Sequence, residues 1–399
     1  LVYTSGTTGE PKGAMHTKAG LQANAAAAVA AQGFTAATRV LSVLPLFHVG
    51  GLCIQTLPAL AAGAAVKLHA RVDPAAWLHD VAQWRPTTSL LVPAVMKAIP
   101  EHPAWPAADL SSLAFVNSGS QVVPTGLIER FHARGVPVAQ VYGSTESGPV
   151  SVALPPDAAR SHAGRVGWPA PGVQLRLVDA GGQAVAEADP AAGRPTSAVG
   201  EVQLKAANLM RGYHRLPQHA SFVDGWLATG DLACRHADGS VEVVGRSKDL
   251  IISGGENIHP AEIENLALAL PGVAEAAVVG LPDARWGEVP VLALVAQPGA
   301  EPDLAALRGL FDARLARFKH PRRVVLLPAL PRTALGKVQK AGLAAGLAAR
   351  WAGGAGSTAE HGSGLTPEGK AVPDSEFDAL AGIAEGASTT GYRDRKDGF

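Results

Sequence analysis

The segment Tyr3-Thr4-Ser5-Gly6-Thr7-Thr8-Gly9-Glu10-Pro11-Lys12-Gly13 follows a strand-like start and precedes a stretch that is typical of a helix. Its glycines let the backbone curl and direct amide groups inward. Its hydroxyl groups and the compact charge of Lys12 suit a polyphosphate. A Walker A loop requires G-x-x-x-x-G-K-[ST], whereas Lys12 lies between Pro11 and Gly13. The sequence therefore predicts a phosphate loop of another kind; the alternative is a Ser/Thr/Gly turn without a ligand.

Outside this loop, short apolar runs alternate with longer helical patterns. Gly, Pro or polar residues bound each apolar run, as expected for buried strands. The expected strands are residues 40–44, 64–68, 89–92, 113–116 and 137–142, and the expected helices are 17–31, 74–84 and 125–134. Such alternation predicts an α/β fold with layered, mostly parallel sheets and helices.

The length of 399 residues suggests two or three domains. Residues 1–247 are expected to form a large N-terminal domain, with a β-rich subdomain over about 164–247, where strands become shorter. Residues 248–348 show a small α+β pattern that could move as one body. Residues 349–399 lose periodicity and are expected to be a disordered tail. Because the chain starts without Met and within a strand-like run, we expect the first domain to be incomplete at its start.

Composition argues against several classes of protein. Lys plus Arg and Asp plus Glu each number 34, so the net charge is 0 and no basic field favours nucleic acid as a partner. Two cysteines, Cys53 and Cys234, are too few for a disulfide framework or a multi-cysteine zinc site, which indicates a reducing, cytoplasmic setting. No apolar run approaches the ~18 residues of a membrane span, and the start does not resemble a signal peptide.

The loop at residues 3–13 resembles the phosphate-binding signature of the acyl-adenylating superfamily, which includes acyl-CoA synthetases, peptide-synthetase adenylation domains and luciferases. Further motifs resemble that family in its own order, over residues 1 to about 348. They are Pro45-Leu46-Phe47-His48 (acyl pocket), Tyr142-Gly143-Ser144-Thr145-Glu146 (adenine and metal), Trp226-Leu227-Ala228-Thr229-Gly230-Asp231 (ribose), Gly245-Arg246-Ser247-Lys248-Asp249 (hinge), Ser253-Gly254-Gly255-Glu256-Asn257-Ile258-His259-Pro260, and Pro331-Arg332-Thr333-Ala334-Leu335-Gly336-Lys337 (C-terminal lysine).

The resemblance implies a site for ATP and Mg²⁺. The residues that would hold the β- and γ-phosphates are Thr4, Ser5, Thr7, Thr8 and Lys12, with Gly6 and Gly9 in the same loop. The residues that would contact adenine are Tyr142, by stacking, Gly143 in the same motif, and the turn Ser118-Gly119-Ser120. The remaining nucleotide contacts would be Thr145 to the α-phosphate, Glu146 to Mg²⁺, Asp231 to both ribose hydroxyls, and Arg246 to the ribose or the α-phosphate. Glu146 could instead be a solvated loop acid, and Asp231 a turn aspartate.

The same resemblance implies a second lysine site and a domain rotation. Lys337 would bridge the carboxylate and the α-phosphate during adenylation; alternatively it is a solvated surface lysine. Lys248 falls at the family's hinge position. Rotation there would bring Gly254 and Gly255 against the site as a wall of the pantetheine tunnel, although a glycine pair also suits a tight turn. His48 would line the acyl pocket and gate thioester formation, or it is an ordinary buried histidine.

Taken together, the motifs imply an ATP-dependent, AMP-forming ligase that joins a small carboxylic acid to the thiol of CoA. Residues 47–53 contain no acid that could hold an α-ammonium group, which favours a fatty or aryl acid over a free amino acid. Two alternatives stay open. The chain could be an acyl-AMP ligase that loads a carrier protein, or an inactive fragment of such an enzyme.

Overall fold

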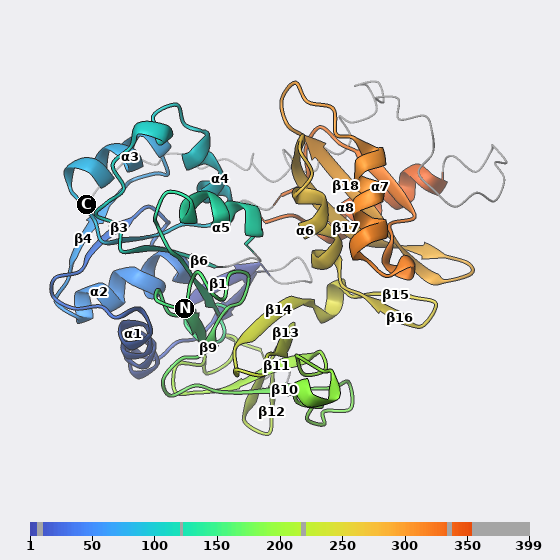
Figure 1. The fold of residues 1–399 in the computed structure, drawn as a ribbon. Coiled ribbons are helices and arrows are strands. Elements are labelled where there is room, and N and C mark those ends of the chain that lie inside the picture. Colours follow the sequence, from blue (N-terminus) through green and yellow to red (C-terminus); the bar gives the residue numbers. More distant parts are fainter. Residues whose placement is uncertain (6–10, 120–122, 217–220, 333–336, 353–399) are drawn as a thin grey trace, which may run out of the picture. The chain divides into compact units, whose positions relative to one another are not determined.

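The computed structural model describes residues 1–5, 11–119, 123–216, 221–332 and 337–352. The chain divides into two compact units, Leu1–Lys248 and the part from Asp249 onward, drawn in Figure 1. The loop residues 6–10 and the predicted tail from residue 353 lie outside the described residues. Among the described residues, no helix is both long and apolar enough to cross a membrane.

The first unit begins with an antiparallel hairpin of β1 (Val2–Ser5) and β2 (Pro11–Ala14), in which Thr4 lies opposite Lys12. The helix that was expected at residues 17–31 is confirmed as α1, and the end of the loop segment forms β2, which was not expected. Helix α1 (Lys18–Gln32) starts after Thr17, whose side chain accepts the Gly20 N–H, and ends before Gly33 at φ 67°.

A seven-stranded sheet forms the centre of the first unit, in the order β4-β3-β5-β6-β7-β8-β9. The first five are mutually parallel, and the last two pair antiparallel. The bounds are β3 Arg39–Ser42, β4 Ala65–Leu68, β5 Thr88–Leu90, β6 Phe115–Gly119, β7 Val138–Tyr142, β8 Val152–Leu154 and β9 Trp168–Pro169. The carboxyl ends of β6 and β7 therefore meet at one edge, where α/β sheets bind ligands.

Helices cover both faces of this sheet (Figure 1). One face packs against α3 (Pro74–Gln83), α4 (Pro93–Glu101) and α5 (Thr125–His132), with Trp77 and Phe131 in the apolar core. The elements on the other face are α1, the π-helix η1 (Gly50–Thr56) and α2 (Leu57–Ala61). A short 3₁₀-helix, η2, spans Trp105–Ala107. The short apolar runs predicted the five parallel strands of this sheet, but β8, β9, η1, α2 and α4 were not expected.

A second, antiparallel sheet completes the first unit, in the order β10-β11-β13-β12 with β14 paired to β13. The bounds are β10 Gln174–Val178, η3 Pro190–Ala192, β11 Gly200–Lys205, β12 Phe222–Val223, β13 Trp226–Arg235 and β14 Val241–Arg246. Its core contains Leu177, Val202 and Leu204. In the β13–β14 register, Asp231 lies opposite Arg246.

The second unit is a mixed sheet with helices on both faces, in the order β16-β15-β18-β17 with β19 parallel to β18. The bounds are η5 Ser247–Asp249 (at the boundary), β15 Ile251–Ser253, β16 Glu256–Ile258, α6 Pro260–Leu268, β17 Val273–Asp283, β18 Gly287–Ala296, α7 Leu304–Arg314, η6 Arg317–Lys319, β19 Arg323–Leu326 and α8 Lys340–Ala352. Helices α6 and α7 share one apolar cluster, and α8 packs in another. Helix α8 runs to Ala352, so residues 349–352, which were assigned to the tail, are helical. The fold-class prediction is confirmed.

Candidate functional site

Lys12, Glu146 and Tyr213 come from separate segments of the first unit and meet in one cluster. The Tyr213 hydroxyl donates to Glu146 Oε1 at 2.7 Å, and Lys12 Nζ lies 5.6 Å from the centroid of the Tyr213 ring. Backbone contacts fix this arrangement, since the Met210 N–H donates to the Glu146 carbonyl at 2.8 Å and Tyr213 pairs with Ala14 at the end of β2. Tyr213 therefore contacts both Lys12, the predicted phosphate ligand, and Glu146, the predicted metal ligand.

Tyr213 is a residue that the sequence reasoning missed. Burial, followed by its bond to the Glu146 carboxylate, raises its pKa, so the hydroxyl stays protonated and continues to donate. The pair is separated by 67 residues along the chain. No local spacing could have indicated this contact.

Thr145, next to Glu146, is buried, and its backbone carbonyl accepts a hydrogen bond of 2.7 Å from His16 Nε2. Burial is the main cause that lowers the pKa of His16, which keeps the ring neutral. This hydrogen bond thus connects the turn that contains Thr145 and Glu146 to the segment just after β2. This contact also was not expected from the sequence.

A second cluster joins Tyr142, Asp231 and Arg246. The Tyr142 hydroxyl donates to Asp231 Oδ2 at 2.8 Å, and Arg246 Nε donates to Asp231 Oδ1 at 2.8 Å. The Asp231 side chain is only 8% exposed. Burial and then the Asp231 charge raise the pKa of Tyr142 well above its usual value. Each carboxylate oxygen keeps further acceptor capacity, which suits a neighbouring pair of hydroxyl groups.

The backbone beside Tyr142 is packed too closely for side chains at two predicted nucleotide contacts. A Cβ on Gly119 would lie 2.5 Å from the Val141 carbonyl oxygen, and one on Gly143 would lie 2.6 Å from the Pro149 carbonyl carbon. Both glycines are therefore needed by the fold itself. Ser118 is buried at the end of β6, and its hydroxyl finds no hydrogen-bond partner among the described residues.

His48 lies just before the π-helix η1. The Gly50 N–H donates to His48 Nδ1 at 3.0 Å, so the neutral ring carries its proton on Nε2. A Cβ on Gly51 would lie 2.3 Å from the Pro45 carbonyl oxygen, which explains a glycine at this bend. The half-buried position of His48 is compatible with both interpretations, a pocket gate and a structural histidine.

In the second unit, Gly254 and Gly255 form the two-residue turn between β15 and β16, with φ values of 61° and 87°. A Cβ on Gly254 would lie 2.6 Å from the Trp286 ring. The tight-turn interpretation therefore explains both glycines, and the tunnel role stays a prediction. Lys248 is exposed at the end of the first unit, and Lys337 is half-buried beside an isolated bridge between Arg332 and Val338.

The tip of the phosphate loop lies outside the described residues. Thr4 and Ser5 end β1, across from Lys12 and Pro11. The predicted contacts outside the described part are Gly6, Thr7, Thr8, Gly9 and Ser120. The predictions for these residues stay predictions.

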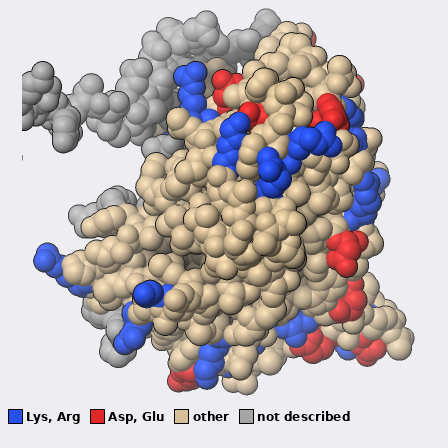
Figure 2. All heavy atoms as spheres, turned by 90° about the vertical axis from the view of Figure 1, so that its left-hand side faces the viewer, with Lys and Arg blue, Asp and Glu red and all other residues tan. Residues whose placement is uncertain are grey.

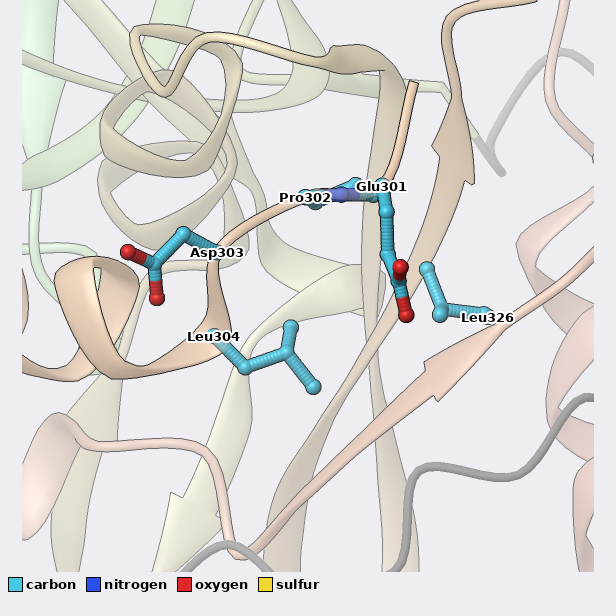
Figure 3. A pocket seen from close by; sticks show the side chains of 5 residues that line it. All are labelled: Glu301, Pro302, Asp303, Leu304 and Leu326. Carbon is cyan, nitrogen blue, oxygen red and sulfur yellow. The ribbon is translucent and has the colours of Figure 1, made fainter. Parts of the chain in front are cut away.

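A hollow in the second unit contains none of the predicted site residues. Its lining is Glu301, Pro302, Asp303, Leu304 and Leu326 (Figure 3). Asp303 accepts hydrogen bonds from the N–H groups of Ala305 and Ala306 at the start of α7, and in Figure 3 its carboxylate points away from Leu326. The Asp303 carboxylate thus forms the N-cap of α7.

Surface charge is mixed on the face shown in Figure 2. Lys and Arg side chains are interspersed there with Asp and Glu, and broad uncharged areas separate them. The balanced composition of the chain is consistent with this distribution.

Comparisons with known proteins identify the family of the chain. Residues 1–214 match the AMP-binding enzyme family, and residues 262–337 match the AMP-binding enzyme C-terminal domain. The chain belongs to the AMP-binding enzyme family, and the resemblance to acyl-adenylating enzymes is confirmed.

Several relatives are named CoA ligases. The chain is 45% identical over 342 residues to indoleacetate–CoA ligase from Aromatoleum aromaticum. The aligned region covers 85% of this chain and 65% of that protein. It is 40% identical to a feruloyl-CoA synthase from Amycolatopsis, covering 85% and 68%. Among solved structures, o-succinylbenzoate CoA synthetase from Bacillus subtilis with its acyl-adenylate intermediate gives a TM-score of 0.76 at 34% identity, covering 86% and 68%. ATP-bound MatB from Rhodopseudomonas palustris gives 0.78 at 32% identity, covering 88% and 68%.

Proposed function

We propose that this chain is the major part of an ATP-dependent, AMP-forming carboxylate–CoA ligase. The observation that carries the proposal is the pair of clusters at the carboxyl end of β7: Lys12, Tyr213 and Glu146 in one, Tyr142, Asp231 and Arg246 in the other. Tyr142 ends β7 and Glu146 follows it by four residues, so groups suited to phosphate, metal and ribose meet the same strand end. The CoA-ligase names of the relatives support the same reaction.

In the first half-reaction, a carboxylate oxygen of the acid attacks the α-phosphorus of ATP. The bond from that phosphorus to pyrophosphate breaks, and the product is an acyl-adenylate. Negative charge accumulates around phosphorus, so catalysis depends on positioning and charge neutralisation. Lys12 and the hydroxyl groups of its loop would hold the phosphates, Asp231 would hold the ribose, and Lys337 would neutralise the α-phosphate.

Glu146 fits a magnesium site by its donor chemistry. Its carboxylate is a hard oxygen ligand, is half-buried, and is oriented by the Tyr213 hydroxyl. Magnesium bound there would supply charge neutralisation to the phosphate oxygens. An ATP complex with magnesium is known for the o-succinylbenzoate CoA synthetase from Bacillus subtilis.

In the second half-reaction, the CoA thiol would lose its proton and attack the acyl carbonyl carbon. The bond to AMP breaks as the thioester forms. We propose that residues 1–247 act as the AMP-binding domain and residues 248–348 as the mobile domain, with Lys248 as the hinge and Gly254-Gly255 beside the pantetheine. The two free, buried cysteines, Cys53 and Cys234, support a reducing cytoplasm as the setting.

The substrate class that we favour is an aryl acid. The indoleacetate, feruloyl and 2-succinylbenzoate names of three relatives all denote acids with an aromatic ring. Residues 47–53 are apolar or small apart from His48, which suits a neutral ring or chain. Fatty acids are the second candidates, because one relative is a medium/long-chain fatty-acid ligase.

Carboxylate-dependent exchange of labelled pyrophosphate into ATP tests the first half-reaction. A panel of short, long and aromatic acids should give exchange with aromatic acids, and omission of the acid should abolish it. The measurement is made on this chain and on a longer chain that spans the full length of its relatives. Exchange by neither, with any acid, would overturn the enzyme proposal.

Thioester formation separates the two ligase candidates. Acyl-CoA should form from acid, ATP and CoA in the absence of a carrier protein. Exchange without acyl-CoA, but with acylation of an added carrier protein, would replace CoA by a carrier as the acceptor.

A further inference from the structure

The hairpin of β13 and β14 gathers three metal-binding residue types on one face. Cys234 lies directly opposite Glu242, and His236 follows Cys234 by two residues. Because side chains alternate along a strand, these three share a face, while Ala233 and Val241 belong to the apolar cluster on the other. One ligand atom from each of the three lies within 4.8 Å of the other two.

We propose that Cys234, His236 and Glu242 form a site for a divalent transition-metal ion, best matched by Zn²⁺. A sulfur, an imidazole nitrogen and a carboxylate oxygen are all zinc ligands, and a water molecule would complete a tetrahedron. Magnesium and calcium prefer oxygen ligands alone, so this donor set selects against them. Binding releases the thiol proton to solvent. Because His236 Nε2 bears the proton of its bond to Glu242 Oε2, ligation by Nε2 also requires that this proton moves to Nδ1 or to solvent.

Neighbouring positive charges are engaged elsewhere. Arg235, between Cys234 and His236 in sequence, donates to the Leu175 carbonyl and reaches the Glu187 carboxylate. Arg165 donates to Asp238. These interactions reduce the repulsion that a bound cation would meet.

The three ligands differ in exposure in a way that suits ion entry. Cys234 is 7% exposed, whereas the Glu242 side chain is 44% exposed. An ion would therefore enter from solvent on the side of the Glu242 carboxylate. The Cys234 thiolate would bind it on the side of the protein interior. His236 Nε2 lies 2.8 Å from Glu242 Oε2, so the two outer ligands are already together.

The alternative is that His236 and Glu242 form an ion pair beside an inert thiol. The two interpretations assign different roles to Cys234. The ion pair does not involve its sulfur, whereas the metal site requires it as a ligand. A bound ion would also brace the hairpin that carries Asp231 and Arg246, since these residues pair on the same two strands.

Cobalt(II) titration of the tag-free, metal-depleted protein tests the site. We expect one equivalent to bind, with the near-ultraviolet band of a cobalt–thiolate bond, and Zn²⁺ to displace it. Cys234→Ser should abolish that band. Cys53→Ser is the matched control, because Cys53 is the other buried cysteine, and it should retain the band.

Two conservative variants distinguish loss of the metal site from misfolding. His236→Gln and Glu242→Gln should each weaken Zn²⁺ affinity by about tenfold or more, the scale seen even for residues that only orient ligands. Each variant should keep the thermal transition that the metal-depleted wild type shows. Absence of a saturable thiolate band, or Zn²⁺ affinity unaltered by Cys234→Ser, would overturn the site and leave the ion pair alone. This outcome is independent of ligase activity.

Discussion

The two compact units differ in what they bury. Among the described residues, every buried polar or charged side chain belongs to the first unit, whereas the second unit buries apolar side chains. Its clusters consist of residues such as Ile263, Leu292 and Phe311 on one face and Val291 and Leu343 on the other. The residues of the second unit that we connect with chemistry, Gly254, Gly255 and Lys337, lie outside its helices and strands.

A buried polar network in the first unit shows what this difference means. Gln55 Nε2 donates to Gln32 Oε1 and to Thr88 Oγ1, both at 3.1 Å, and Asn117 Nδ2 donates to Gln32 Oε1 at 2.9 Å. The carbonyl oxygens of Gln55 and Asn117 find no partner among the described residues. Burying such groups costs free energy unless they are paired. The network joins α1, η1, β5 and β6 by hydrogen bonds, which fixes the positions of these four elements relative to one another.

The largest expected effect tests whether the two units are separate in stability. Trp77→Ala should lower the unfolding free energy of the first unit by about 3–5 kcal/mol, because a fully buried indole and its bond to Ser89 are lost. Phe311→Ala is the matched variant in the second unit and should lower the unfolding free energy of that unit by a similar amount. Calorimetry or denaturant titration should show a different transition shifted in each. A common shift of one transition by both variants would contradict two independent units.

Lys337→Ala tests the chemical contribution of the second unit. Removing one preorganised stabilising charge costs about 10²–10³-fold in rate, so exchange should fall by that factor. Thioester formation from supplied acyl-adenylate should change little. The matched control is Lys340→Ala, since Lys340 forms an ion pair with Glu264 at 2.7 Å in the same unit. Equal losses in both half-reactions, or in both variants, would remove the proposed role of Lys337.

Sequence reasoning succeeded where the information is local. Short apolar runs and helical patterns predicted the parallel strands and three of their helices, and the family resemblance implied Asp231 and Arg246, which the structure joins. It failed where contacts depend on register or distance along the chain. Tyr213 reaches Glu146 across 67 residues, and Cys234 meets Glu242 only through the β13–β14 pairing. The π-helix η1 was not predicted, because its first residues, Gly50 and Gly51, have low helix propensity.

Asp231→Asn tests the buried charge of the first unit. The substitution preserves shape but removes a carboxylate bonded to Arg246 and Tyr142. A hydrogen bond to a charged group contributes about 1.5–3 kcal/mol, so the KM for ATP should rise about 10–100-fold. Asp238→Asn in the same hairpin is the control, because the Asp238 carboxylate bonds Ser240 and Arg165 near the surface. An unchanged KM for Asp231→Asn would contradict the ribose assignment.

The smallest expected effect concerns the orientation of Glu146. Tyr213→Phe removes the hydroxyl donor but keeps the ring beside Lys12, and one such bond contributes about 0.5–1.5 kcal/mol. The Mg²⁺ concentration for half-maximal exchange should therefore rise about 2–10-fold, while Tyr3→Phe, at an exposed ring, should leave it unchanged.

The raised pKa of Tyr213 sharpens this prediction. The folded-state pKa lies above the usual tyrosine value, so the hydroxyl stays protonated throughout the neutral range and is lost only in strong alkali. The ratio of variant to wild-type Mg²⁺ requirement should accordingly be constant between about pH 6 and pH 9. A ratio that falls to one within that range would mean that Tyr213 does not act as a permanent donor to Glu146. Because a merely structural tyrosine would alter stability and not the Mg²⁺ requirement, the titration separates a positioning role from a packing role.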